Sequence, residues 1–181
     1  MTSRIYPALT FLLIITSLLF AQSSQKANTL TLNNTAPTFF LKTLTGEDFF
    51  LSDYCGVPRQ PWKKPERKMV VLSFFATYCL PCLKEIPQLQ ELAEEKEEDA
   101  IFVLIDLKEE PEKVAAFVES QQIKLPVLLD RFGVVGDKYG VDSLPTLFFI
   151  DGGGKIRYMQ RGYSEDLIKN LRKVWLLARG E

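Results

Sequence analysis

The sequence predicts an α/β fold in which a mixed β-sheet lies between layers of helices. Three segments, Met69–Ala76, Ile101–Leu107 and Thr146–Ile150, are near-continuous apolar runs, as strands buried on both faces are. Helical segments follow the first two runs, and this alternation is typical of a parallel sheet covered by helices. With 46% hydrophobic residues, the chain of 181 residues has enough apolar material for one domain core.

The N-terminal part of this domain is predicted to be a β-hairpin. Phe39–Leu44 and Asp48–Ser52 are strand-like and flank a turn that contains Gly46. Residues 55–68 follow and contain three prolines and many charges, so they are predicted to form a loop inserted before the first buried strand.

Helices and short strands complete the pattern. Pro87 lies inside the first predicted helix, where it removes one backbone hydrogen bond and is expected to kink the helix. The remaining predicted elements are, in chain order, the helices Leu80–Glu98 and Pro111–Gln121, the strand Val127–Leu129, the short helix Arg131–Tyr139 closed by Gly140, the antiparallel strand Ile156–Gln160 and an amphipathic helix capped by Ser164.

The N-terminal residues 1–21 are predicted to be a signal peptide or an uncleaved membrane anchor. Arg4 precedes an apolar run over residues 8–21, and the polar residues 22–35 are predicted to be a linker. The run is short for a transmembrane helix, which favours a signal peptide. Leu19 stands where cleavage prefers a small residue, which favours an anchor. Both alternatives place the rest of the chain in the periplasm or another extracytoplasmic space.

Charge and composition exclude several functions. A formal net charge of -1 offers no basic face for nucleic acid. The chain has no histidine, which excludes Cys-His and Ser-His-Asp catalysis as well as histidine-bound metals. Acid–base chemistry must therefore come from carboxylates, lysine, tyrosine, cysteine or water, and no metal or cofactor is expected.

The three cysteines comprise one close pair, Cys79 and Cys82, and the separate Cys55. The pair directly follows a buried strand and opens a helix, where free backbone N–H groups and the helix dipole stabilise a thiolate. Cys79 is therefore the predicted nucleophile, and Cys82 the resolving cysteine of a redox-active disulfide. A static disulfide is the alternative, although it would stabilise little across so short a loop.

Two longer segments around these residues resemble the signature segments of the thioredoxin superfamily. They are SFFATYCLPCLKEIP (Ser73–Pro87) and VDSLPTLFFIDGGGKI (Val141–Ile156). More narrowly, they resemble the TlpA/ResA-like exported thiol-disulfide oxidoreductases of the redoxin (AhpC-TSA) group. The resemblance covers residues 36–181 and implies a thioredoxin-like three-layer sandwich with an N-terminal β-hairpin extension.

The resemblance also implies roles for residues outside the cysteine pair. Pro145 matches the family's cis-proline, so the Leu144-Pro145 bond is expected to be cis and to lie where extended substrate polypeptide docks. Glu85 matches an active-site glutamate of this branch, expected to transfer protons or tune the thiol pKa values. A solvated helix carboxylate is the alternative. Ser73 stands where thioredoxin has a buried acid, so that proton acceptor is expected to be absent.

The inserted loop 55–68 departs from the family pattern and carries Cys55 and Trp62. The following strand leads toward the active site, so the loop is expected at the strand's far end, ~26 Å away at ~3.3 Å per residue. Cys55 is therefore expected to be a free cysteine that does not reach Cys79. An intermolecular disulfide is the alternative.

Together these observations predict a protein thiol-disulfide oxidoreductase that exchanges Cys79 and Cys82 with cysteines of exported proteins. The resemblance implies a monomeric reductase supplied with electrons by a membrane partner, and cytochrome c maturation is the family's best-known task. Two other classes stay open. A peroxiredoxin-like thiol peroxidase would need a threonine where Ala76 stands, together with a supporting arginine. A non-enzymatic binding module would not need the intact cysteines.

Overall fold

The computed structural model describes residues 30–58, 67–96 and 98–179. The predicted signal peptide or anchor (1–21), most of the predicted linker, and the middle of the inserted loop with Trp62 lie outside the described residues. The helices and strands are, in chain order, β1 (Phe40–Lys42), β2 (Asp48–Phe50), the short 3-10 helix η2 (Leu51–Asp53), β3 (Met69–Phe75), α2 (Cys82–Glu95), β4 (Ala100–Leu107), α3 (Pro111–Ser120), β5 (Val127–Asp130), α4 (Val134–Tyr139), β6 (Thr146–Ile150), β7 (Ile156–Arg161) and α5 (Leu167–Arg179).

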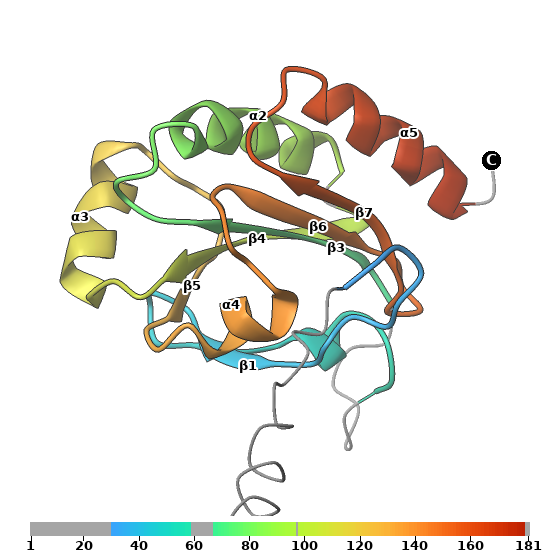
Figure 1. Cartoon of the computed structure of the whole chain (residues 1–181), viewed down its shortest axis with the longest axis horizontal. Coiled ribbons are helices and arrows are strands. Elements are labelled where there is room, and N and C mark those ends of the chain that lie inside the picture. The colour runs from blue at the N-terminus through green and yellow to red at the C-terminus, as the bar shows by residue number, and fades with distance from the viewer. Residues whose placement is uncertain (1–29, 59–66, 97, 180–181) are drawn as a thin grey trace, which may run out of the picture.

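A five-stranded mixed sheet with the order β5-β4-β3-β6-β7 forms the centre of the domain (Figure 1). β3, β4 and β5 run parallel, while β6 is antiparallel to β3 and β7 is antiparallel to β6. β3 thus lies between two neighbours, and its side chains point to the two faces of the sheet, where residues 70–75 are buried. The parallel strands are joined through α2 and α3, as connections between parallel neighbours require.

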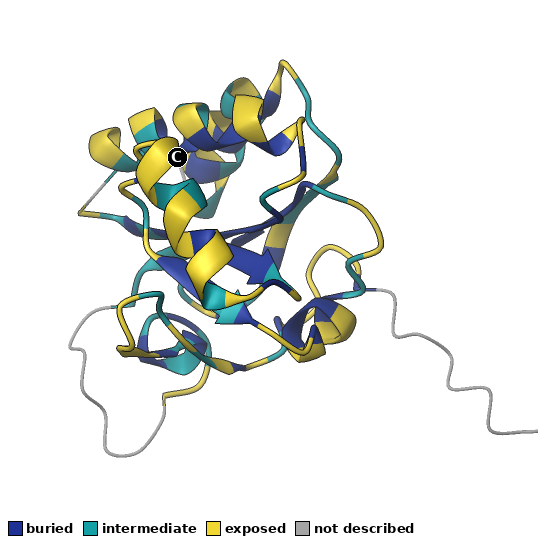
Figure 2. Ribbon diagram, turned by 90° about the vertical axis from the view of Figure 1, so that its left-hand side faces the viewer, coloured by how far each residue is buried: buried dark blue, intermediate teal, exposed yellow. Residues whose placement is uncertain are grey.

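Helices cover both faces of the sheet, so the predicted thioredoxin-like three-layer arrangement is confirmed. One core cluster joins the sheet to α2, α3 and α5, through Ile86, Val114 and Trp175. The other joins the opposite face to α4 and the N-terminal hairpin, through Val135 and Phe49. Figure 2 shows the buried residues concentrated on the sheet and on the inward sides of the helices.

The N-terminal hairpin is present as predicted. β1 pairs with β2 in antiparallel register, and Gly46 in the turn between them has a φ of 89°, a conformation that glycine adopts without strain. Thr43 bridges to Leu128 of β5, which places the hairpin beside the β5 edge of the sheet. Residues 30–35, at the end of the predicted linker, pack on the domain, since Leu30 is buried and Thr35 bridges to Lys155.

Three helices begin later than the sequence predicts. α2 begins at Cys82 because Cys79–Pro81 form a turn, in which Cys82 N donates to Cys79 O at 3.1 Å. α4 begins at Val134 because Gly133 before it is left-handed, with a φ of 70°. α5 begins at Leu167, whose N–H donates to the carbonyl of Ser164. Within the described part of the chain, no helix has the length and apolar character that crossing a membrane requires.

Candidate active site

Cys79 and Cys82 form a disulfide at the junction between β3 and α2. β3 delivers the chain to the carboxyl end of the sheet, and a short turn then leads into the first residue of α2. The N–H of Cys82 donates to Cys79 Sγ at 3.3 Å. Cys79 is 6% exposed and Cys82 is 1% exposed, so an attacking thiol reaches Cys79 more readily.

This geometry suits Cys79 for thiolate chemistry. An N–H group at the start of a helix points at its sulfur, and the positive end of the helix dipole lies there as well. Both effects stabilise a negative sulfur and lower the pKa of a thiol. The more buried Cys82 lies one turn further on, in position to attack a mixed disulfide formed on Cys79.

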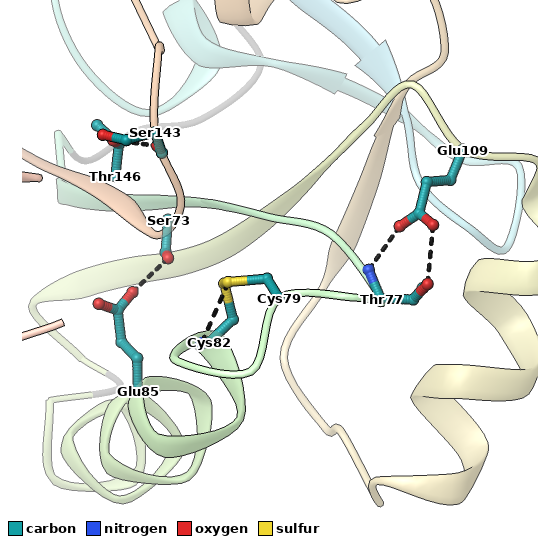
Figure 3. Close-up of a disulfide and its surroundings, with 8 residues drawn as sticks. All are labelled: Ser73, Thr77, Cys79, Cys82, Glu85, Glu109, Ser143 and Thr146. Carbon is teal, nitrogen blue, oxygen red and sulfur yellow. Dashed lines mark hydrogen bonds between the residues drawn. A yellow bond between two sulfur atoms is a disulfide. The ribbon is translucent and has the colours of Figure 1, made fainter. Parts of the chain in front are cut away.

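Glu85 lies on α2 with its side chain turned inward toward β3. Glu85 is 1% exposed, and Ser73 Oγ donates to Glu85 Oε1 at 2.5 Å (Figure 3). The alternative of a solvated helix carboxylate is therefore wrong. The expectation that a buried acid is absent at this place also needs correction, because the carboxyl of Glu85 reaches the serine from the neighbouring helix.

The surroundings of Glu85 favour its protonated form. Burial raises the pKa of this carboxyl to about 7, and the hydrogen bond from Ser73 offsets only part of that effect. Its second oxygen, Oε2, is buried without a hydrogen-bond partner among the described residues. A carboxyl with a free oxygen and a pKa near neutrality can accept a proton and return it at physiological pH.

A second carboxylate lies on the other side of the disulfide (Figure 3). Glu109 follows β4, and its side chain accepts hydrogen bonds from Thr77 N at 2.5 Å and from Thr77 Oγ at 2.8 Å. Lys113 Nζ contacts the same carboxylate at 2.5 Å. The N–H of Glu109 in turn donates to Asp106 Oδ2 at 3.3 Å.

The two acids of this group are held in different states. Burial opposes ionisation of Glu109, but the hydrogen bonds from Lys113 and Thr77 outweigh it and lower the pKa of its carboxyl. Burial and the adjacent Glu109 raise the pKa of Asp106 well above its usual range. Nothing in the sequence marks Glu109 as a site residue, because it stands in an acidic loop. Asp106 carries a signal, since it is a carboxylic acid inside an apolar strand and needs a partner there.

The segment around Pro145 lies at the same end of the sheet as the disulfide. The Leu144-Pro145 peptide bond is cis, in agreement with the prediction. Thr146 directly after it pairs with Phe74, close to the end of β3. Gly162 N donates to the carbonyl of Pro145 at 2.7 Å, which ties this segment to the end of β7. Leu144 is partly buried against the core.

Cys55 is a free thiol on the opposite face of the sheet. It belongs to the core cluster of α4 and the hairpin, whereas the disulfide belongs to the cluster of α2 and α5. Its residue is 2% exposed, and burial raises the pKa of its thiol to about 12. The structure therefore separates Cys55 from Cys79, as predicted, and burial of the Cys55 thiol outweighs the charge of Arg67, which by itself would favour the thiolate.

The sheet order, the cysteine pair at a helix start and the cis-proline together define a thioredoxin-fold thiol-disulfide oxidoreductase. Residues 32–159 match the family model described as the AhpC/TSA family, and the chain belongs to this family.

Similar proteins are described in terms that agree with this class. The chain is 30% identical over 159 residues to the thiol-disulfide oxidoreductase ResA of Geobacillus thermodenitrificans (strain NG80-2), covering 86% of this chain and 85% of the relative. It is 35% identical over 130 residues to the thioredoxin-like protein YneN of Bacillus subtilis (strain 168), covering 70% and 69%.

A solved structure shows the same fold. The exposed lipoprotein thioredoxin (Etrx1) of Streptococcus pneumoniae strain TIGR4 superimposes with a TM-score of 0.63 at 29% identity, covering 77% of this chain and 98% of that one. The predicted resemblance to the TlpA/ResA-like branch is confirmed.

Proposed function

We infer that this chain reduces disulfides in exported proteins, with Cys79 as the nucleophile and Cys82 as the resolving cysteine. The observation that carries this function is the pair's position at the start of α2, with the N–H of Cys82 donating to Cys79 Sγ. Glu85 is proposed to be its proton carrier, since its buried carboxyl has a free oxygen beside the pair. Leu144 and Pro145 are proposed to dock the substrate backbone.

The reaction transfers two electrons from the reduced pair to the substrate. The Cys79 thiolate attacks one sulfur of the substrate disulfide, forming a mixed disulfide while the other substrate sulfur leaves as a thiolate and takes up a proton. Cys82 then passes its proton to Glu85 and attacks Cys79 Sγ. The second substrate sulfur leaves as a thiolate and is protonated, and the Cys79–Cys82 disulfide remains.

The proposed setting is extracytoplasmic, with a membrane protein that returns the pair to its reduced state. Residues 1–21 would serve as the export signal or as an anchor, and the working form would be a monomer. A similar protein supports this setting, since it is described as an exposed lipoprotein thioredoxin. A role in cytochrome c maturation is the more specific proposal. The substrate would then be the oxidised cysteine pair of an apocytochrome, which this protein would reduce.

Trapping tests the assignment of the two cysteines. Cys82→Ala should leave mixed disulfides with substrate proteins on Cys79, visible as bands that disappear on reduction. Cys79→Ala should trap none of them, and Cys55→Ala should behave like the unaltered protein because that thiol is buried. If Cys79→Ala accumulates the substrates instead, the two roles are reversed.

A redox titration tests the direction. A reductase should have a potential below about -200 mV, whereas a value near about -120 mV would identify an oxidase of thiols. An insulin-reduction assay without any turnover would instead favour the non-enzymatic module.

A further inference from the structure

The turn before the nucleophile is attached to a single carboxylate. Thr77 stands two residues before Cys79, and both its N–H and its hydroxyl donate to Glu109, at 2.5 and 2.8 Å. The Glu109 side chain is only 5% exposed, so these hydrogen bonds are shielded from water. Charged acceptors make stronger hydrogen bonds than neutral ones, and two donors from one residue fix its orientation as well as its position.

Glu109 is itself fixed to the sheet. Lys108, directly after β4, adopts a left-handed conformation with a φ of 63°, which turns the chain sharply there. The N–H of Lys108 donates to the carbonyl of Asp130 on β5, and the N–H of Glu109 donates to Asp106 on β4. The backbone at Glu109, whose carboxylate holds Thr77, is therefore tied to two neighbouring strands of the sheet.

We propose that Glu109 is a positioning residue for Cys79: through Thr77 it holds the turn so that Cys79 Sγ faces the N–H of Cys82. This inference rests on the proposed function, because it assigns a second residue to the same thiolate. The proposal concerns geometry, since among the described residues no hydrogen bond joins Glu109 directly to either cysteine.

The charged and titratable groups around Glu109 come from every element that packs there. Asp106 belongs to β4, Lys113 to α3, and Tyr78 to the turn itself, with Lys113 Nζ 5.7 Å from the centre of the Tyr78 ring. Removing the negative charge of Glu109 by itself would stabilise a nearby thiolate and lower the pKa of Cys79. Loosening the turn has the opposite effect, because the sulfur then loses its N–H partner and the pKa rises toward that of an ordinary thiol.

Because loss of charge and loosening of the turn shift the pKa of Cys79 in opposite directions, the direction of the measured shift tests the proposal. In a Cys82→Ser background, the rate of alkylation of Cys79 by iodoacetamide is measured from pH 5 to pH 10, with the labelled peptide identified by mass spectrometry. Glu109→Gln keeps the shape of the side chain but has one acceptor oxygen instead of two. We expect the pKa of Cys79 to rise by about half a unit or more, a threefold loss of thiolate well below that pKa.

Two further comparisons separate positioning from stability. Glu110→Gln changes the neighbouring residue, whose exposed carboxylate contacts Arg131, and it should leave the pKa of Cys79 unchanged. Thr77→Val removes the hydroxyl donor without a change of charge and should raise the pKa of Cys79, while Thr77→Ser should recover most of the difference. Thermal unfolding of each variant shows whether the domain remains folded at the assay temperature.

The outcomes are distinguishable. If a folded Glu109→Gln protein shows a lowered or unchanged Cys79 pKa, Glu109 does not position the turn and the proposal is overturned. If Thr77→Val matches the unaltered protein, the proposal fails in the same way. Failure of the proposed function shows itself separately, since it would appear as absence of insulin reduction by the unaltered protein, whereas alkylation of Cys79 needs no protein substrate.

Discussion

Two buried glutamates flank the disulfide, and they differ in the number of donors that reach them (Figure 3). Glu85 receives one hydrogen bond, from Ser73, and its other oxygen has no partner among the described residues. Glu109 receives two from Thr77 and a third contact from Lys113. Burial opposes ionisation of both, yet it raises the pKa of Glu85 to about 7, while the donors around Glu109 lower its pKa.

The difference shows that burial alone does not decide what a carboxyl does in an active site. With a single donor, Glu85 is close to the balance between its two protonation states at neutral pH, which suits a group that moves protons. With three donors, Glu109 stays ionised and is held in place, which suits a group that holds backbone. Environments that push the pKa values of two neighbouring acids apart often mark a division of roles.

The largest expected effect is on proton transfer by Glu85. Glu85→Gln keeps the size of the side chain but cannot accept a proton, so attack by Cys82 on the mixed disulfide should slow by about ten- to a hundredfold at pH 7. Single-turnover stopped-flow measurements of mixed-disulfide release give this rate. Glu94→Gln is the matched control, because it changes an exposed carboxylate on the same helix. A rate equal to that of the unaltered protein would remove Glu85 from the mechanism.

The next effect is on the pH dependence of stability. The pKa of Glu85 is about 7 in the folded protein, against 4.5 for an ordinary glutamate, so the folded state binds the proton more tightly. Stability contributed by this group is therefore full below pH 4.5 and is lost as the pH rises toward 7. The loss amounts to about 3 kcal/mol.

Glu85→Gln should abolish this loss. Urea unfolding of the oxidised proteins at several pH values should show that the variant gains about 3 kcal/mol relative to the unaltered protein between pH 4 and pH 8. A difference between the two proteins that is independent of pH would mean that Glu85 is ionised with an ordinary pKa in the folded state.

The sequence predicts much of the fold, because local sequence patterns mark buried strands and the residues at which helices end. The run at residues 69–76 marks the central strand, and Gly140 marks the end of α4. The starts of helices are less predictable. α4 begins only after Gly133 because this glycine is left-handed, and the sequence does not show which conformation a glycine adopts.

The site residues also differ in how well the sequence predicts them. Cys79 and Cys82 are recognisable because they are adjacent in sequence and lie at a strand-to-helix junction. The pairing of Ser73 with Glu85 depends on the packing of α2 against β3, and the sequence alone suggested that the acid was missing. Glu109 contacts a residue 32 positions away, and no local pattern encodes such a contact.

A smaller effect is expected at Ser73, which donates a hydrogen bond to Glu85. Ser73→Ala removes the hydrogen bond that lowers the pKa of Glu85, so burial acts unopposed and the pKa rises from its value of about 7. The midpoint of the pH–rate profile for disulfide exchange should move upward by less than about one unit. Ser120→Ala, at the exposed end of α3, serves as the control. A downward shift would show that the hydroxyl favours the protonated acid instead.

The smallest effect is expected at Lys113. This lysine contacts Glu109 at 2.5 Å, but its side chain is 58% exposed, and exposed ion pairs contribute little to stability. Thr77 supplies two donors that are independent of the lysine, so Glu109 should remain ionised and in place when Lys113→Met removes the charge. We expect the alkylation rate of Cys79 at pH 7 to stay within about twofold of that of the unaltered protein, at low and at high salt. A loss as large as that of Glu109→Gln would show that the lysine, rather than the backbone of the turn, determines where the carboxylate lies.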